Sequence, residues 1–339
     1  MKRYGYLWED IIDFDNLVKA HYNAKRGKSW YKEVKMVESD TYYYIDQIHG
    51  MLVDKTYNVS PYKVFVRKES GKERVISKLP YYPDRIIQWA LVQIIEPVFI
   101  RNFITDTYSA IPEKGIHYGL KRLHKALQNK EETKYCLKFD IKKYYQSISH
   151  LLLKKSLRRL FKDQDLLWLL DKTIDSVEGD FGIPIGNYTS QYFGNFFLSG
   201  LDHYIKEKKD HYFYARYMDD VVIFHRNKKY LNYLRKDIDW YLAAKLNLTM
   251  KENWQVFPTF ARGVDFLGYR SFGDYTLLRK ATANRFKSKM LAIKEDKCIG
   301  FSKENCVASY SGWLKWCDSH RLRNKYLVPA REVIYANNI

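Results

Sequence analysis

The amino-acid sequence predicts an α+β protein, built from helices and short antiparallel strands. Apolar residues recur at helical spacing towards both ends of the chain. Two strand-like runs, 213–216 and 221–224, flank the acidic pair Asp219-Asp220, which predicts a tight hairpin. A third run, 134–141, alternates at the period of a strand. We therefore expect a sheet from the middle of the chain, with helices around it.

Composition indicates a globular protein with a polyanionic partner. The 339 residues carry 58 Lys and Arg against 39 Asp and Glu, and the net charge of +19 exceeds what solubility requires. Aromatic residues make up 17%, and rings combined with basic side chains are typical of proteins that hold single-stranded nucleic acid. A basic protein with a merely solvated surface is the alternative. The sequence contains no apolar run of about 18 residues, the length that a membrane span needs, and its first residues lack a signal-peptide core. We therefore expect a cytoplasmic protein without a membrane partner.

Residues 1–58 predict a helical lobe, because 8–18, 31–37 and 42–52 each show helical apolar periodicity. A basic break at 25–28, Lys-Arg-Gly-Lys, interrupts this pattern. The break is either a solvated loop or a segment that contacts phosphate.

Residues 62–78 predict a β-hairpin with its turn at 69–72. Basic side chains on or near the tip could grip a triphosphate. A solvated charged hairpin explains the same residues. The basic residues are Arg67, Lys68, Lys72 and Arg74.

Helical periodicity predicts a helix that starts at Asp84 and ends or turns at Pro97. It also predicts helices over 118–129, 150–176 and 228–246.

A loop from Gly182 to Asn187 contains glycines that permit close backbone approach, and Thr189-Ser190-Gln191 open the next helix. Residues 266–280 predict one hairpin around a turn at 272–274. The last sixty or so residues are helix-like and basic, with Trp313, Leu314 and Trp316 as their apolar anchor.

Asp140 closes the strand 134–141 and points away from its apolar row, so it is a candidate metal ligand beside Asp219 and Asp220. A helix N-cap is the alternative role for Asp140, and an ordinary turn is the alternative for the hairpin pair. Phosphoryl transfer by two divalent ions needs carboxylates from different parts of the chain. The two elements meet that need if they pair in one sheet.

In chain order, these blocks resemble the fingers and palm of reverse transcriptases. Residues 67–74 resemble the fingers hairpin that clasps the incoming nucleotide, and 139–145 resembles the first catalytic motif. Gly182–Gln191 resembles the loop and helix that position template and nucleotide. Tyr217-Met218-Asp219-Asp220 is the family's best-known signature, and 266–269 resembles the primer-grip hairpin.

The resemblance covers residues 60 to 280 and implies a right-hand polymerase with fingers, a palm with an antiparallel sheet, and a small helical thumb. It divides the chain into an N-terminal helical extension (1–60), fingers and palm (61–275) and a thumb (276–339). The residues after the primer-grip hairpin are expected to leave room for a small thumb and none for an RNase H or endonuclease domain.

The resemblance implies an RNA-directed DNA polymerase that uses an RNA template, a cDNA or primer strand and dNTPs. Two Mg²⁺ ions, or Mn²⁺ in their place, are expected at Asp140, Ile141, Asp219 and Asp220. Lys251 is matched to a catalytic lysine that protonates pyrophosphate, and Tyr145 to a steric gate against the ribose 2′-hydroxyl. The implied nucleotide-binding residues are Arg67, Lys72, Arg74, Ile141, Tyr145, Ile185, Gly186 and Gln191. The implied primer grip comprises Phe266, Leu267, Gly268 and Tyr269.

A finer resemblance is to the reverse transcriptases of diversity-generating retroelements. It rests on Ile185–Gln191, Trp254-Gln255-Val256, Arg262–Arg270 and the tail Ser311–His320. In that bacterial or phage-encoded family, an RNA template is copied with errors at adenines, the cDNA replaces a variable region of a target gene, and a basic accessory variability protein is a partner. Where accurate enzymes carry Gln beside the nucleotide sugar, the apolar Ile185 cannot hydrogen-bond and constrains the nucleotide less.

Two alternatives stay open. A bacterial antiphage-defence reverse transcriptase, of the retron-like or abortive-infection kind, would share the catalytic core without a variable-region target. The Asn-Ala-x-x-His signature expected of retron enzymes is not seen. A non-catalytic RNA-binding scaffold on a polymerase fold is the alternative of another class, and the intact acids Asp140, Asp219 and Asp220 argue against it.

Overall fold

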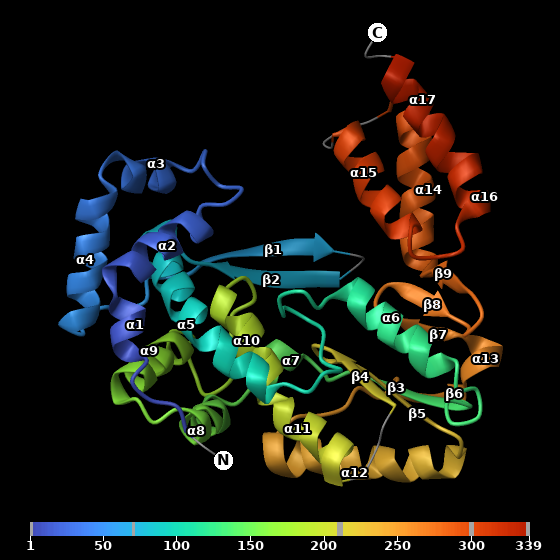
Figure 1. Ribbon diagram of the computed structural model, residues 1–339, viewed down its shortest axis with the longest axis horizontal. Coiled ribbons are helices and arrows are strands. Elements are labelled where there is room, and N and C mark those ends of the chain that lie inside the picture. Colours follow the sequence, from blue (N-terminus) through green and yellow to red (C-terminus); the bar gives the residue numbers. More distant parts are fainter. Residues whose placement is uncertain (1–2, 70–71, 209–212, 298–301, 337–339) are drawn as a thin grey trace. The chain divides into compact units, whose positions relative to one another are not determined.

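The computed structural model describes residues 3–69, 72–208, 213–297 and 302–336, and Figure 1 shows their helices and strands. The mixture of helices and antiparallel strands confirms the predicted α+β class. The chain divides into two compact units. Unit 1 comprises Met1–Thr105, Ile141–Asp210 and Asp237–Lys251, and unit 2 comprises Asp106–Asp140, His211–Lys236 and Glu252–Ile339.

Unit 1 is organised around helix α5 (Ile86–Asn102), against which α1, α2 and α10 pack. Pro97 lies inside α5, so the expectation that the helix ends there is wrong. Ile95 and Phe99 are fully buried on either side of the proline. Their packing outweighs the single backbone hydrogen bond that proline removes.

Helices over residues 8–53 confirm the predicted helical N-terminal segment. The side chains of Asp13 and Asp40 cap two of them by accepting hydrogen bonds from backbone amides. The other helices that lie in unit 1, where η marks a short π-helix, are α1 (Trp8–Ile12), α2 (Phe14–Ala24), α3 (Lys32–Ser39), α4 (Thr41–Val53), η1 (Tyr81–Arg85), α7 (Tyr144–Ser147), α8 (His150–Leu160), α9 (Gln164–Asp175), α10 (Tyr188–Phe197), α11 (Ser199–His203) and η2 (Tyr204–Lys208).

The predicted hairpin is present as strands β1 (Lys63–Glu69) and β2 (Lys72–Lys78), which pair antiparallel. Ser70 and Gly71 of the expected turn, and the side chain of Lys72, lie outside the described parts. Arg67 pairs directly with Arg74, so both side chains stand on one face of the hairpin.

Unit 2 contains a four-stranded antiparallel sheet of order β4-β5-β3-β6. One face of the sheet packs against α6 (Ile116–Leu127) through Leu120, Leu123 and Leu127. Helix α12 (Lys228–Leu246) follows β5, over the residues that the sequence predicts. The sequence did not indicate β6. The strands are β3 (Tyr135–Phe139), β4 (Tyr214–Tyr217), β5 (Asp220–His225) and β6 (Gln255–Pro258).

A second sheet in unit 2 has three strands where the sequence predicted one hairpin. Leu267 and Gly268 have φ angles of 55° and 86° and form the turn between the first two strands, and the third strand ends at Leu278. Both central residues of a tight hairpin turn adopt such positive φ angles, which were not recognised in the sequence. The strands are β7 (Val264–Phe266), β8 (Tyr269–Ser271) and β9 (Thr276–Leu278), preceded by α13 (Thr259–Arg262).

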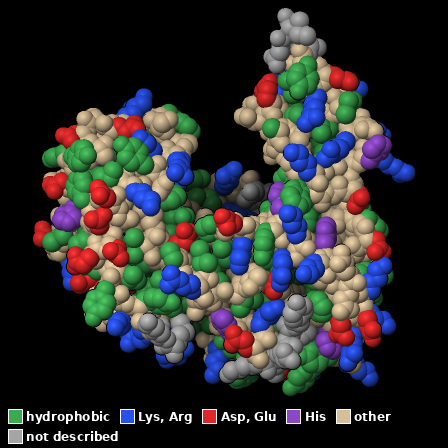
Figure 2. All heavy atoms as spheres, in the orientation of Figure 1, with side chains coloured by type: hydrophobic (Ala, Val, Ile, Leu, Met, Phe, Trp, Pro, Cys, Tyr) green, Lys and Arg blue, Asp and Glu red, His purple; other side chains and the backbone are tan. Residues whose placement is uncertain are grey.

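The C-terminal segment is helical, as expected, and Trp313, Leu314 and Trp316 pack against the core of unit 2. On the face drawn in Figure 2, Lys and Arg side chains are more frequent over α6 and the C-terminal helices than over the N-terminal helices. Among the described residues, no helix is both long and apolar enough to cross a bilayer. The C-terminal elements are α14 (Lys280–Lys294), α15 (Lys303–Leu314), α16 (His320–Leu322), η3 (Arg323–Leu327) and α17 (Val328–Ala336).

Gly268→Ala is expected to lower the thermal unfolding temperature. An added Cβ would lie 2.6 Å from the Trp313 ring, on a backbone with positive φ, at a cost of about 1–3 kcal/mol. Gly312→Ala is the matched control, because its Cβ would meet nothing within 4 Å and alanine favours the helix by roughly 0.5–1 kcal/mol. Circular dichroism melts check this, and equal shifts for both variants would contradict it.

Candidate active site

Strand pairing brings two of the predicted carboxylates together. Phe139, the last residue of β3, pairs with Val221 of β5, so Asp140 and Asp220 lie at the same end of adjacent strands. Both line a cavity of about 430 Å³ in unit 2. Asp219 is the second residue of the turn Met218-Asp219 that joins β4 to β5, and Asp220 is the first residue of β5. The expectation that the two elements pair in one sheet is confirmed.

Asp220 is a half-buried carboxylate with one close cation. Lys138 Nζ lies 3.3 Å from Oδ1 and donates to Oδ2 at 3.4 Å. Burial raises the pKa of Asp220, the Lys138 cation opposes this rise, and the Asp140 carboxylate adds to it. Lys138 also donates to the backbone oxygen of Asp265 in β7, and the Asp265 carboxylate accepts from Arg279 Nε at 2.5 Å. Lys138 therefore connects the acidic strand ends to the second sheet.

The chemistry of these acids fits divalent cations. Carboxylate oxygens are the preferred ligands of hard divalent ions, and buried Oδ1 of Asp220 has an ion pair with Lys138 but accepts no hydrogen bond. Neighbouring carboxylates in a desolvated site repel each other, and a cation removes that cost. Within the described ranges, no three His, Cys, Asp or Glu side chains are grouped as a complete ligand set. The fit therefore rests on Asp140 and Asp220, with Asp219 in the adjoining turn.

Arg216 of β4 holds the turn that carries Asp219. Its side chain is fully buried, and Nη1 donates to the carbonyl oxygen of Met218 at 3.0 Å. Met218 has φ 57°, a conformation that residues other than glycine seldom adopt. Periodicity did not predict this role, although a lone charged residue in an otherwise apolar strand is a signal that the sequence contains.

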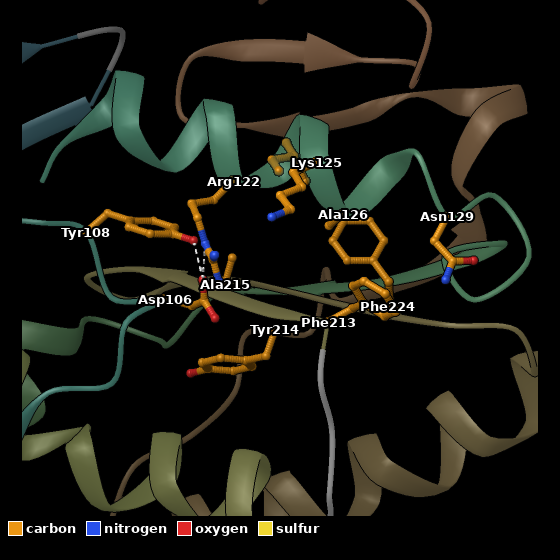
Figure 3. Close-up of a pocket in the computed structure, with 11 residues that line it drawn as sticks. Asp106, Tyr108, Arg122, Lys125, Ala126, Asn129, Phe213, Tyr214, Ala215 and Phe224 are labelled. Atoms are coloured by element: carbon orange, nitrogen blue, oxygen red, sulfur yellow. Dashed lines mark hydrogen bonds and ion pairs between the residues drawn. The ribbon is translucent and has the colours of Figure 1, made fainter.

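A segment before α6 supports Arg216 in turn. The Arg216 amide donates to Asp106 O at 2.9 Å, and the Tyr108 amide donates to Arg216 O at 3.1 Å. The Asp106 carboxylate accepts from Arg122 Nε at 3.0 Å and from Tyr108 Oη at 2.9 Å (Figure 3). These residues lie at one end of a cavity of about 190 Å³ between α6 and β4. The contacts tie α6 to the strand that leads into the turn.

In unit 1, the loop 182–187 joins Tyr145 to the β1–β2 hairpin. The Ile183 amide donates to Tyr145 O at 2.8 Å, and the Ser77 amide donates to Ile185 O at 2.9 Å. A Cβ on Gly186, which has φ 122°, would lie 3.0 Å from Ser77 O. The backbone at Ile185 and Gly186 is thus fixed against β2, and glycine is needed for the close approach.

The other residues matched to nucleotide binding are also in unit 1. Arg67, Arg74 and Gln191 are exposed. Ile141 forms an antiparallel bridge with Met250, and Lys251 is the next residue after Met250.

The residues matched to the primer grip lie in the turn between β7 and β8 and in the strands that flank it. Phe266 and Tyr269 are fully buried, and Leu267 is nearly so. Tyr269 Oη donates to Trp313 O at 3.0 Å. These side chains therefore belong to the core of unit 2.

Comparison with known proteins identifies a family. Residues 66–271 match the family described as "Reverse transcriptase (RNA-dependent DNA polymerase)". Protein YkfC of Escherichia coli (strain K12) is 26% identical over 282 residues, 71% of this chain and 72% of YkfC. The group II intron-encoded protein LtrA of Lactococcus lactis subsp. cremoris is 23% identical over 227 residues, 63% of this chain.

Among solved structures, apo telomerase from Candida tropicalis is similar, with a TM-score of 0.51 at 13% identity over 68% of this chain. The chain covers 37% of LtrA and 50% of that telomerase chain. Likeness at this level of identity shows the fold alone, and this fold is the predicted right-hand polymerase.

Asp220→Asn is expected to stabilise the protein at neutral pH without metal. The pKa of Asp220 is raised in the folded protein. The protonated carboxyl therefore stabilises the fold fully below the unfolded pKa of about 3.9, and this stabilisation is lost as the pH rises through the folded pKa. The uncharged amide avoids that loss.

Urea unfolding in EDTA at neutral pH and at about pH 3 measures the difference, which should vanish in acid. Asp274→Asn is the control, because the Asp274 side chain is 73% exposed and the substitution should change little. A destabilised Asp220→Asn variant at neutral pH would contradict the expectation.

Proposed function

The chain belongs to the reverse transcriptase (RNA-dependent DNA polymerase) family, and from this premise we propose that it makes error-prone cDNA in a diversity-generating retroelement. The pairing of β3 with β5 supports the polymerase chemistry, since it gathers Asp140 and Asp220 in one cavity. The loop Ile185–Gln191 supports the retroelement assignment through its resemblance to that subfamily.

The proposed reaction adds dNTPs to a cDNA or primer strand on an RNA template. Divalent ions, in our proposal two Mg²⁺, supply activation of the 3′-hydroxyl and stabilisation of the pyrophosphate leaving group. Asp140, Asp219 and Asp220 would hold them, with Ile141 beside the first acid.

The nucleotide-binding roles follow the chemistry of each side chain. Arg67 and Arg74, a cross-strand pair on one hairpin face, bind the triphosphate by charge-assisted hydrogen bonds. Tyr145 excludes the ribose 2′-hydroxyl, and Lys251 gives a proton to the leaving pyrophosphate.

We attribute the proposed copying errors at template adenines to the side chain of Ile185. The backbone at residue 185 is fixed by the Ser77 amide, so a change of side chain there alters contact with the nucleotide and leaves the loop in place. An apolar isoleucine offers no hydrogen bond to restrain a misaligned nucleotide. The net charge of +19 suits RNA and cDNA as partners, and the basic accessory variability protein is proposed from the subfamily resemblance.

Asp219→Asn is expected to reduce primer extension on an RNA template to background, because a neutral amide is a much poorer ligand for divalent ions. Asp274→Asn, an exposed carboxylate changed in the same way, should extend like the parent enzyme. Extension that is unaffected by Asp219→Asn would remove the two-metal assignment. RNA binding without extension by the parent chain would favour the scaffold alternative.

Ile185→Gln is expected to lower the error frequency opposite template adenines by roughly two- to ten-fold, the effect of one added hydrogen bond. Ile185→Leu is the matched control and should keep the parent error frequency, since it stays apolar. Sequencing of cDNA from all three enzymes provides the measurement. Equal adenine error frequencies for Gln and Ile would refute the proposed cause, and accurate copying by the parent would favour the antiphage alternative.

A further inference from the structure

A cationic cavity lies at the base of the β1–β2 hairpin in unit 1, and none of the roles above uses it. Its volume is about 370 Å³, and Lys32, Lys63 and Lys78 contribute to its lining. Lys63 pairs directly with Lys78 across the two strands, so both side chains stand on one face. Like charges placed opposite each other in a sheet are destabilising, which indicates that the arrangement serves something other than the fold.

Two further cations lie close to this cavity. The amide of Tyr31, which lines the cavity, donates to Lys28 O at 2.9 Å, and burial, Arg85 and Lys78 each lower the pKa of Lys28. Arg85 Nε is buried and has no hydrogen-bond partner. Glu33 is the one acid among the lining residues, and it accepts a hydrogen bond from the Tyr81 amide. The positive charge around the cavity exceeds what Glu33 can balance, so the cavity suits an anion.

One aromatic ring lines the cavity and a second lies next to it, and together they narrow the class of anion. Lys78 Nζ lies 4.7 Å from the centre of the Tyr31 ring, which lines the cavity. Trp30 is 67% exposed, and the centres of the Trp30 and Tyr31 rings lie 5.8 Å apart in a T-shaped arrangement. An exposed indole beside phosphate-binding cations is suited to stack a base while lysines hold the backbone. Inorganic phosphate would leave the indole unused.

The cavity is separate from the residues proposed for the triphosphate. Arg67 and Arg74 lie four residues along the same strands from Lys63 and Lys78. At about 3.3 Å per residue, this separation is roughly 13 Å.

We propose that this cavity and Trp30 bind a single-stranded segment of the RNA template, with phosphodiesters on Lys63 and Lys78 and a base stacked on Trp30. The identity of the strand as template rests on the proposed function. In this proposal the basic break at 25–28 contributes Lys28 to phosphate binding, which is the second of the two roles that the sequence left open.

Fluorescence anisotropy with a labelled single-stranded RNA, in EDTA and without dNTPs, tests the proposal on the full chain. The double variant Lys63→Gln, Lys78→Gln should bind more weakly than the parent. Loss of two phosphate contacts should make the slope of log affinity against log salt shallower by about 1.4. The matched control is Lys19→Gln, Lys35→Gln, which removes two exposed lysines of the same unit from outside the cavity and should keep most of the slope.

Stacking is tested independently. Trp30→Ala should weaken RNA binding roughly five-fold or more, and Trp30→Phe should restore part of the affinity. Thermal melts verify folding, and the Trp30 variants decide the outcome if the double lysine variant does not fold.

The proposal would be overturned by two results together. The Lys63→Gln, Lys78→Gln variant would have the same RNA affinity and salt slope as the Lys19→Gln, Lys35→Gln control, and Trp30→Ala would bind RNA as tightly as the parent. A raised KM for dNTPs at unchanged RNA affinity would assign the cavity to the nucleotide and also overturn it. Tighter binding of single-stranded DNA of the same sequence would overturn the assignment to the template. Since binding is measured without metal or dNTPs, failure of polymerisation or of adenine errors leaves these results interpretable.

Discussion

The antiparallel register between β3 and β5 is the constraint on which the candidate site depends. Phe139 opposite Val221 sets Asp140 and Asp220 at the same strand ends, and a slip of one residue would turn each side chain to the other face. β3 is also paired on its other side by β6, so its register is fixed from both edges. The acids are close because the apolar residues of a central strand require that register.

The carboxylates need support because their arrangement is unfavourable in isolation. Burial disfavours the charge on Asp220, and the ion pair with Lys138 offsets part of that cost. The left-handed Met218 costs backbone energy, and the buried Arg216 compensates by satisfying its carbonyl. Lys138 lines the same cavity as Asp140 and Asp220, so its charge acts on the acids within the cavity itself.

Local sequence patterns predicted the strands that carry the acids and the hairpin that carries Arg67 and Arg74, because alternation and turn residues report the backbone directly. They did not predict β6, a short strand that ends in proline. They also predicted wrongly that the helix ends at Pro97, which lies inside α5 because tertiary packing holds its neighbours. Lys138 is two residues before Asp140, so the strand pattern places both side chains on one face and predicts that Lys138 lies near the acids. The contact between Arg216 and Met218 depends on a turn conformation that no periodicity encodes.

The loop 182–187 shows how fold and specificity are separated in unit 1. Its position is set by backbone hydrogen bonds to Tyr145 and Ser77 and by the absence of a Cβ at Gly186. These constraints do not involve the side chain of residue 185, which is therefore free to vary without loss of the loop. In the role proposed for Ile185, its side chain contacts the nucleotide and contributes little to the fold, so selection on copying accuracy could act at this position without changing the fold around it.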